Sequence, residues 1–456
     1  MRTTALFGSV LLAAQSARSL DLDPDNAESV KAATSKIAAN MLDWYKGDES
    51  PNAPGLLPPP YYWWNAGAMF GSLIDYWYYT GDDTYNAVTT EAMLFQVGPD
   101  ENYMPPNQSK SLGNDDQAFW GMAAMSAAEA KFPNPPEDKP QWLALAQAVV
   151  NSQIPRWDDK SCAGGLKWQI YTFNNGYNYK NSISNGCFFN LAARLGMYLG
   201  NQTYLDEAEK HWEWSQTIGL ISKDYQIYDG TDDTLNCTDF NHIQWSYNSG
   251  VYLLGAAVMW NQTESDPTKQ ALWKSRIQGL LDSASRIFFY QDTGIMFEVA
   301  CEPSGNCNLD QQSFKAYLSR WMAATVKVAP WTHDIIMPLL KTSAIAAAKA
   351  CTGGGVQDAT CGGKWFQGTY DGQKGVGQQM SALEAIQSML IDQVQGPVTN
   401  SSGGTSRSDN PNVGLGGDDN AGVPVPTITT ADRAGAGILS ALVMIGILGG
   451  AWWMLA

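Results

Sequence analysis

The chain alternates between two kinds of apolar segment. In the first kind apolar residues cover nearly the whole circumference of a helix, as in residues 69–74 and 187–193. Helices of that kind are buried on all sides. In the second kind apolar residues keep to one face: within residues 204–218, Leu205 and Trp212 share a face and charged residues fill most of the rest. That pattern is typical of an amphipathic helix packed on a core.

Six buried segments alternate with six amphipathic ones, at a spacing of roughly 50 to 70 residues between buried segments. The buried helices are expected to begin near Trp64, Asn114, Ser184, Tyr247, Gln312 and Gly377. The amphipathic helices are expected at residues 26–45, 84–95, 140–154, 204–218, 270–288 and 335–350. This alternation predicts an all-α (α/α)6 barrel with six inner and six outer helices. Successive inner helices would run parallel, so their N-terminal ends would open on one face.

Both ends of the chain have the pattern of processing signals. Residues 1–19 combine a basic Arg2, an apolar stretch and a small-residue cleavage site, which predicts a secretory signal peptide. Residues 421–456 combine a polar spacer with an apolar tail, preceded by the small residues that begin at Asn420. This order is typical of a glycosylphosphatidylinositol (GPI) anchor signal, with Asn420 as the attachment residue. The alternative is a tail-anchored membrane helix.

Between these signals, residues 20–396 show no linker-like break and are expected to form one catalytic domain. Residues 397–420 are rich in Ser, Gly and Asn, which predicts a flexible stalk.

The cysteines and glycosylation motifs agree with a secreted protein. Seven cysteines would enter an oxidising compartment. Cys301 with Cys307 and Cys351 with Cys361 bracket short Gly-containing loops, so each pair is expected to form a local disulfide. We expect Cys162 to pair with Cys237, and Cys187, in an apolar helical run, to be a buried thiol. Asn-x-Ser/Thr motifs predict glycosylation at Asn107, Asn201, Asn236, Asn261 and Asn400.

Charge and composition exclude several partners. The net charge is −17, and such a surface repels nucleic acid and anionic lipid. Three histidines and no Cys-x-x-Cys motif argue against a metal site, and no cofactor is expected. Eighteen Trp and twenty Tyr are many for this length. Most would be core residues, and those at the helix starts could stack on sugar rings.

Asp115 and Asp116 stand at the start of the second buried helix and admit two interpretations. Carboxylates at a helix start accept the free backbone N–H groups and suit the helix dipole. Two carboxylates are also what many glycosidases use, one as an acid/base and the other as a nucleophile. A cap requires one such residue, whereas here two carboxylates lie among inner-helix starts rich in amides and aromatics. The barrel geometry therefore favours the catalytic interpretation.

The segment Leu112-Gly113-Asn114-Asp115-Asp116-Gln117-Ala118-Phe119-Trp120 resembles the catalytic motif of glycoside hydrolase family 76, the endo-1,6-α-mannanases. The resemblance extends through residues 62–69, 184–186, 229–230 and 244–248 and includes both terminal signals. It is strongest for the GPI-anchored fungal cell-wall branch.

The resemblance implies an (α/α)6 fold and a retaining mechanism, with Asp115 as nucleophile and Asp116 as acid/base. It implies a monomer that acts on α-1,6-mannan or on the mannose core of GPI anchors. In the fungal branch the implied role is transglycosylation, which would join GPI-anchored mannoproteins to cell-wall glucan at the outer face of the plasma membrane. The alternatives are a plain hydrolase of mannan, a non-catalytic mannan-binding protein and, with less support, an unrelated (α/α)6 glucosidase or a lyase.

Substrate contacts are expected from residues at or just before the inner-helix starts. They are Trp64, Asn65, Asn185, Asp229, Trp245, Asn248 and Lys315. Lys315 could instead be a solvated charge at the rim.

Overall fold

The computed structural model describes residues 20–354, 359–416, 440 and 444. Within these ranges the chain forms twelve α-helices. They are α1 (Ala27–Leu42), α2 (Trp63–Thr80), α3 (Asn86–Phe95), α4 (Asn114–Glu129), α5 (Trp142–Gln153), α6 (Ser182–Leu199), α7 (Gln202–Ile218), α8 (Ser246–Gln262), α9 (Pro267–Ile287), α10 (Phe314–Val328), α11 (His333–Lys349) and α12 (Val376–Gln387).

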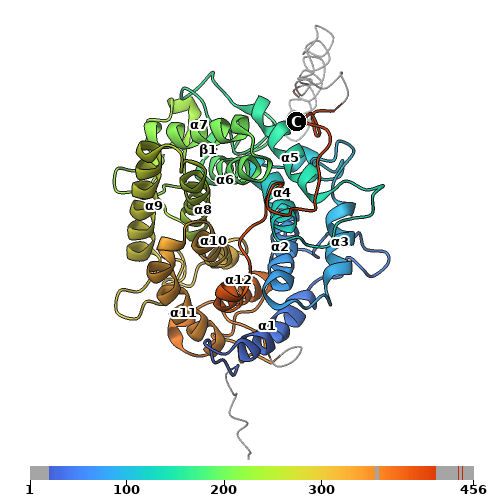
Figure 1. Ribbon diagram of the computed structural model, residues 1–456, viewed down its shortest axis with the longest axis vertical. Helices are drawn as coiled ribbons and strands as arrows, with labels where there is room; N and C mark the ends of the chain where they lie inside the picture. Colours follow the sequence, from blue (N-terminus) through green and yellow to red (C-terminus); the bar gives the residue numbers. More distant parts are fainter. Residues whose placement is uncertain (1–19, 355–358, 417–439, 441–443, 445–456) are drawn as a thin grey trace, which may run out of the picture. The chain divides into compact units, whose positions relative to one another are not determined.

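The even-numbered helices form a closed inner ring. Each packs on the next, from α2 through α4, α6, α8 and α10 to α12, and α12 returns to α2. The odd-numbered helices pack outside this ring (Figure 1). The (α/α)6 barrel expected from the sequence is therefore confirmed, with the helices near the expected positions.

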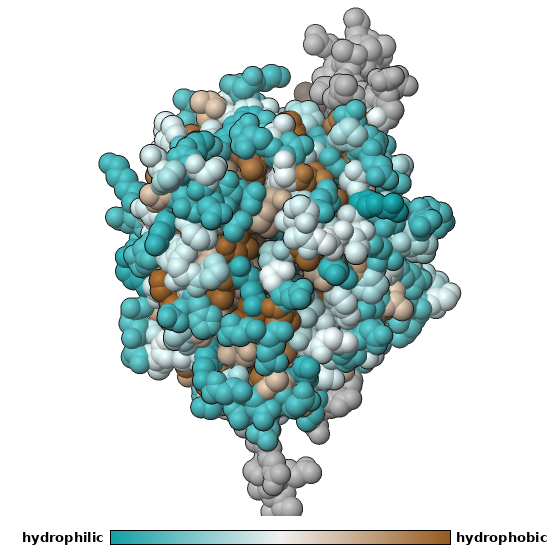
Figure 2. Space-filling view, in the orientation of Figure 1, coloured by the Kyte–Doolittle hydropathy of each residue, from teal (hydrophilic) through white to brown (hydrophobic). Residues whose placement is uncertain are grey.

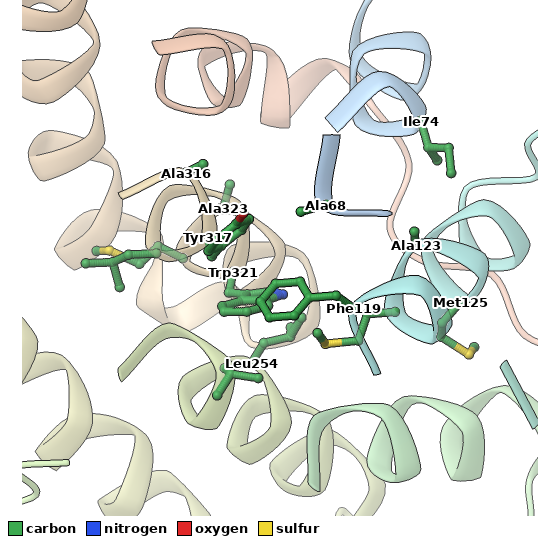
Figure 3. Packing of buried hydrophobic residues seen from close by; sticks show 14 of the residues in the cluster. Ala68, Ile74, Phe119, Ala123, Met125, Leu254, Ala316, Tyr317, Trp321 and Ala323 are labelled. Carbon is green, nitrogen blue, oxygen red and sulfur yellow. The ribbon is translucent and has the colours of Figure 1, made fainter. Parts of the chain in front are cut away.

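The inner helices are apolar on all sides because they face two layers. Toward the outside they pack on the outer helices, and toward the inside they fill the barrel centre. Phe119 on α4 lies against Tyr317 and Trp321 on α10, with ring centroids 5.0 and 6.4 Å away (Figure 3). Small residues let the inner helices approach closely: a Cβ on Gly67 would lie 2.7 Å from the Trp120 ring.

The two rings begin their helices differently. Outer helices α1, α7 and α9 start at Asn26, Asn201 and Asp266, whose side chains accept backbone N–H groups of the first turn. Such caps stabilise a helix by about 1 kcal/mol each. Among the inner helices a side-chain cap of this kind occurs at Asn181, before α6. At α2 and α4 a side chain inside the first turn reaches back instead: Asn65 accepts the Tyr62 N–H, and Asp116 accepts the Gly113 N–H.

The opposite end of the barrel is held together by buried ion pairs. Arg320 on α10 pairs with Asp75 on α2 at 2.7 Å and with Glu384 on α12 at 2.6 Å. Arg194 on α6 pairs with Glu129 on α4 at 2.6 Å. These pairs link five of the six inner helices, and the cavity that remains there is about 70 Å³.

Short strands and 3-10 helices connect the long helices. Strands β1 (Tyr179–Asn181), β2 (Gly230–Asp232) and β3 (Phe240–Asn241) form an antiparallel sheet in that order. The 3-10 helices are η1 (Ser109–Ser111), η2 (Ile154–Arg156), η3 (Asp233–Leu235), η4 (Gln311–Ser313), η5 (Pro330–Thr332), η7 (Trp365–Gln367) and η8 (Ser388–Gln393). Strand β1 leads directly into α6, so the sheet lies at the start of an inner helix.

The prediction of a flexible stalk is wrong for residues 397–414. Residues 397–414, here called the C-terminal strap, belong to the first compact unit of the chain, which ends at Gly414. The backbone N–H of Val398 donates to Glu129 O, and that of Asn400 donates to Tyr198 O. Figure 1 shows the strap passing α4 and α5. The prediction failed because a Ser/Gly/Asn-rich segment can satisfy its backbone groups on a neighbouring surface as well as in water.

The signal peptide (residues 1–19), the attachment residue Asn420 and the anchor signal (421–456, apart from residues 440 and 444) lie outside the described residues. Within the described part of the chain no helix is long and apolar enough to cross a membrane. All five asparagines of the glycosylation motifs are exposed, so each is accessible to modification. Hydrophilic residues cover most of the face seen in Figure 2.

Candidate active site

A cavity of about 210 Å³ opens where the inner helices begin. Its walls come from the starts of α2, α4, α8 and α10, from β1, and from the loops before these elements. The lining residues are Trp64, Asp115, Asp116, Phe119, Trp168, Tyr179, Asn181, Asp229, Tyr247, Asp310 and Phe314. The sequence prediction that the inner starts converge on one basin is confirmed.

The local structure at the start of α4 brings both aspartates to the cavity. Asn114 is fixed by its neighbours: its backbone N–H donates to Trp168 O at 2.8 Å, and its side chain donates to Lys167 O at 2.8 Å. Asp116 accepts the backbone N–H of Gly113 at 2.7 Å and so also caps the helix. A Cβ at residue 113 would lie 2.3 Å from Asp115 Oδ1, so glycine leaves room for that carboxylate.

Burial raises the pKa of both aspartates. For Asp115, burial is the largest cause and the charge of Asp116 adds to it, while backbone N–H groups and the Ser184 hydroxyl, 3.4 Å from Oδ1, oppose the rise. For Asp116, burial raises the pKa to about 7, against the Gly113 N–H and together with the charge of Asp310. The two carboxyls titrate as a pair. One of them can therefore hold a proton near neutral pH, as an acid/base catalyst requires.

Two further carboxylates line the cavity, and the described lining residues include no basic side chain. Asp229 accepts hydrogen bonds from the Tyr179 hydroxyl at 2.6 Å and from the Asn241 side chain at 3.2 Å. Asp310 accepts one from the Asn65 side chain at 3.3 Å. Burial raises the pKa of Asp229 and Asp310, while their hydrogen bonds lower it. The cavity is therefore suited to a neutral ligand that develops positive charge.

Aromatic rings form the rest of the wall. Trp64 lies against Phe119 with ring centroids 4.8 Å apart. Tyr247 stacks on Phe314 at 3.8 Å with the two planes 9° apart. Trp168 and Tyr179 complete the wall. Flat aromatic faces beside carboxylates are the arrangement that binds sugar rings, because the apolar face of a sugar stacks while its hydroxyls hydrogen bond.

The glycosyl hydrolase family 76 model matches residues 29–401. The chain belongs to this family. It is 47% identical over 447 residues to the mannan endo-1,6-alpha-mannosidase DCW1 of Saccharomyces cerevisiae, covering 98% of this chain and 97% of that protein.

Solved structures of the family share the fold. A crystal structure of Dfg5 from Chaetomium thermophilum in complex with glucosamine has a TM-score of 0.82 and 47% identity, covering 86% of this chain and 97% of that one. An inactive variant of the alpha-1,6-mannanase GH76A of Salegentibacter sp. HEL1_6, in complex with alpha-1,6-mannotriose, has a TM-score of 0.61 and 17% identity. That likeness covers 79% of this chain and 99% of the mannanase.

Of the residues expected at the site, Trp64, Asp115, Asp116 and Asp229 line the cavity. Asp310, which also lines it, was missed. It lies in the loop before η4, and neither helical periodicity nor a carboxylate pair singles it out.

Two predicted contacts support the cavity from behind its wall. Asn65 is buried; its Oδ1 accepts the Tyr62 backbone N–H at 2.9 Å, and its Nδ2 donates to Asp310. The Trp245 side chain hydrogen bonds to Asp229, and its ring lies edge-on to Phe314 at 5.6 Å. Both residues are outside the cavity lining and position the groups that line it.

The predictions for Asn185 and Asn248 are wrong as direct contacts. Both side chains are fully buried and outside the cavity lining. Asn185 accepts the Leu166 backbone N–H at 2.8 Å and donates to Leu166 O at 3.0 Å. It therefore anchors the segment that leads to Trp168. A residue of the first helical turn points toward the cavity or toward a neighbouring helix, and the sequence alone does not distinguish these cases.

Lys315 is neither a substrate contact nor a solvated rim charge. Its side chain is buried, pairs with the buried Glu302, and donates to Gly363 O at 2.5 Å. Its ammonium lies 3.8 Å from the centroid of the Trp365 ring. Lys315 therefore joins α10 to two loops.

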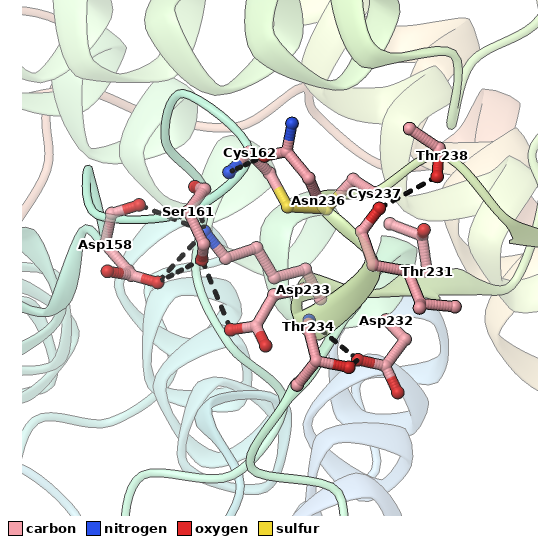
Figure 4. Close-up of a disulfide and its surroundings, with 12 residues drawn as sticks. Asp158, Ser161, Cys162, Thr231, Asp232, Asp233, Thr234, Asn236, Cys237 and Thr238 are labelled. Carbon is pink, nitrogen blue, oxygen red and sulfur yellow. Dashed lines mark hydrogen bonds and ion pairs between the residues drawn. A yellow bond between two sulfur atoms is a disulfide. The ribbon is translucent and has the colours of Figure 1, made fainter.

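All three expected disulfides are formed: Cys162–Cys237, Cys301–Cys307 and Cys351–Cys361. Cys187 is buried and free, as expected. Figure 4 shows Cys162–Cys237 beside Asp158, Ser161 and Asp233. Buried Lys180 pairs with Asp158 at 3.1 Å, and Lys167 pairs with both aspartates.

This cluster holds the loop that carries Trp168 into the cavity wall. Among the described residues no group of three or more His, Cys, Asp and Glu side chains is arranged to hold a metal ion.

Proposed function

We propose that this protein is a glycosidase of the endo-α-1,6-mannosidase type, with Asp115 and Asp116 as its catalytic pair. The observation that carries the proposal is the position of these two adjacent, half-buried carboxyls in an aromatic-lined cavity at the mouth of the barrel. The chain belongs to a glycoside hydrolase family, and the relative DCW1 is named as a mannan endo-1,6-alpha-mannosidase.

The proposed reaction has two steps and retains the anomeric configuration. First, Asp115 attacks the anomeric carbon as the protonated Asp116 gives its proton to the leaving oxygen, which breaks the glycosidic bond and leaves a mannosyl ester on Asp115. Next, Asp116 removes the proton from an incoming hydroxyl, whose oxygen displaces Asp115. Adjacent carboxyls suit the short separation of about 5 Å that retaining enzymes use.

The other two carboxylates have a defined part in this scheme. Positive charge develops on the sugar ring in the transition state. Asp229 and Asp310 bring negative charge to the same cavity, and their hydrogen bonds to Tyr179 and Asn65 keep them oriented. Oriented charges of this kind stabilise the transition state more than the neutral ground state.

We further propose that the incoming hydroxyl belongs to a sugar, so that the enzyme is a transglycosidase. The donor would be the mannose core of a GPI anchor and the acceptor a cell-wall glucan, with the enzyme acting as a GPI-anchored monomer outside the plasma membrane. Support comes from the processing signals in the sequence, from three disulfides typical of oxidising compartments, and from the glucosamine complex of the Chaetomium relative.

One incubation distinguishes the outcomes. The purified enzyme is mixed with linear α-1,6-mannan or a mannose-containing GPI-core glycan, with and without a labelled glucan acceptor. Labelled conjugate supports transfer, and free reducing ends without conjugate support hydrolysis. Binding without either product would leave the non-catalytic alternative. Asp115→Asn is the control, and equal turnover by this variant would overturn the catalytic assignment.

A further inference from the structure

The segment from Trp168 to Tyr179 is an uncharged, aromatic arm beside the cavity. Its sequence, WQIYTFNNGYNY, contains five aromatic residues, several amides and no charged side chain, in a chain that is 16% charged. Its first and last residues, Trp168 and Tyr179, line the catalytic cavity. The arm therefore leaves the cavity wall, extends outward and returns.

Two aromatic rings of the arm are stacked, of which Phe173 is exposed and Tyr171 is half-buried. Tyr171 and Phe173 lie with centroids 5.3 Å apart and planes 14° apart. Phe173 is 68% exposed, the highest exposure among the large hydrophobic side chains of the described residues. An exposed apolar ring that is held flat by a partner forms a surface on which another flat apolar face can stack.

The arm is held in this conformation by its own contacts. The Asn174 side chain donates to Lys110 O at 2.9 Å and to Gln169 Oε1 at 3.1 Å, which ties the arm to the segment before α4. Gly176 has a φ of +89°, and a Cβ there would lie 2.3 Å from the Trp168 ring. The arm is thus fixed to both the catalytic segment and the cavity wall.

A second cavity, of about 480 Å³, lies along the arm on the side away from the catalytic cavity. The side chains alternate: Trp168 lines the catalytic cavity, whereas Lys167 and Gln169 line the second one, together with Trp157 and Tyr177. An antiparallel β-bridge between Gly113 and Gln169 joins the arm to the start of the catalytic helix α4. The stacked pair follows Ile170, which also lines the second cavity.

We propose that the Tyr171–Phe173 pair and the adjoining cavity form an outer glycan subsite, which binds sugars several residues away from the bond that is cut. The aromatic and amide composition matches a neutral carbohydrate, which stacks on rings and hydrogen bonds to amides. Nucleic acid also stacks on aromatic rings, but its binding requires an excess of basic side chains to neutralise phosphates. The arm has no basic side chain, and the three in the adjoining cavity are matched there by three carboxylates: Arg156, Lys160 and Lys167 against Asp158, Asp159 and Asp233. The arm's continuity with the catalytic wall identifies the occupant as the same glycan chain, so the inference rests on the proposed glycosidase function.

The test compares short and long substrates on three variants. Phe173→Ala and Tyr171→Ala remove the platform, and Phe95→Ala is the matched control, because Phe95 is 57% exposed on α3 and lines neither cavity. Loss of one stacking ring corresponds to about a 2- to 13-fold loss of affinity. We expect kcat/KM on long linear α-1,6-mannan to fall by this factor through KM, with kcat and the activity on α-1,6-mannotriose unchanged. Phe95→Ala should match the wild type on both substrates.

Calorimetric binding of the same two glycans to each protein separates the two proposals. If wild-type protein binds long mannan without cleaving it, the proposed activity fails, yet weaker binding by Phe173→Ala still supports the subsite. Equal affinity of wild type and Phe173→Ala for long mannan overturns the subsite, whatever the turnover. An equal loss on mannotriose also overturns it, since that would place the ring at the catalytic cavity. Thermal unfolding of the exposed-site variants should match that of the wild type.

Discussion

The C-terminal strap gives the sharpest test of the fold, because the sequence suggests a free stalk there. Asn151 on α5 binds the strap through its side-chain N–H₂, which donates to Pro411 O and Val413 O, both at 2.9 Å. Its Oδ1 accepts the hydroxyl of Tyr204 on α7 at 2.9 Å. Asn151→Ala removes all three bonds. The two bonds to Pro411 O and Val413 O are the ones that hold the strap, and at about 0.5 to 1.5 kcal/mol each they contribute about 1 to 3 kcal/mol to its attachment.

The matched control is Asn134→Ala. Asn134 also donates to a strap carbonyl, Thr405 O at 3.0 Å, but this bond is exposed and single. Its loss should cost about 0.5 kcal/mol or less. The assay is trypsin cleavage after Arg407, which is exposed within the strap. Cleavage requires the strap to open, so its rate follows the population of the open form.

We expect Asn151→Ala to raise the cleavage rate by about 5- to 150-fold and Asn134→Ala to raise it by about twofold. Thermal unfolding of Asn151→Ala should begin earlier by a few degrees. If the wild-type strap is cut as fast as an unstructured peptide, or if the two variants are cut at the same rate, the packed strap is refuted.

Three further predictions follow from buried ionisable groups. Burial raises the pKa of Asp116 from 3.8 to about 7, so between pH 4 and pH 7 the folded protein binds more protons than the unfolded chain and loses stability as the pH rises. In urea unfolding, Asp116→Asn should be more stable than the wild type by up to about 4 kcal/mol at pH 8 and equally stable at pH 4. Lys315→Ala leaves Glu302 buried and unpaired, and should lower the free energy of unfolding by about 3 kcal/mol with KM unchanged at a temperature where the variant is folded; a raised KM would restore the substrate-contact interpretation. Glu298 accepts the backbone N–H of Ser246 at the start of α8, and burial raises its pKa to about 8. Glu298→Gln should therefore keep its stability and kcat at pH 7, whereas Glu298→Ala should lose about 1 kcal/mol in the free energy of unfolding. Equal melting temperatures for the two variants would contradict this.

The sequence predicts the barrel well because its evidence is redundant. Six segments that are apolar on all sides and six amphipathic segments each indicate an inner or an outer helix independently, so one misjudged helix boundary does not change the predicted fold. The disulfides followed from similar local evidence: Cys301 and Cys307 enclose a short loop, which leaves them close together in any fold. Asp115 and Asp116 were found because they are adjacent, stand at a helix start and occur within a recognisable motif.

What the sequence missed depends on the direction of single side chains. Asp310 reaches the cavity from a loop and carries no periodic signal, whereas Asn185 stands at an inner-helix start and points into the protein. Lys315 can be buried because Glu302, thirteen positions earlier in a loop, forms an ion pair with it. Helical periodicity, at 3.6 residues per turn, predicts which side of a helix a residue occupies, but an error of one position rotates that residue by about 100°. It does not give the loops that cover that face.

The central claim is that Asp115 is the nucleophile and Asp116 the acid/base. Burial raises the pKa of both groups, so the roles rest on the family resemblance and need a chemical test. The most direct test treats Asp116→Ala with an α-mannoside that carries an activated leaving group, in the presence of azide. Such a substrate can form the ester on Asp115 without an acid, and azide then replaces the hydroxyl that Asp116 would activate. We expect restored turnover and α-mannosyl azide as the product. A β-mannosyl azide would show that the nucleophile had been removed, and would contradict the assignment.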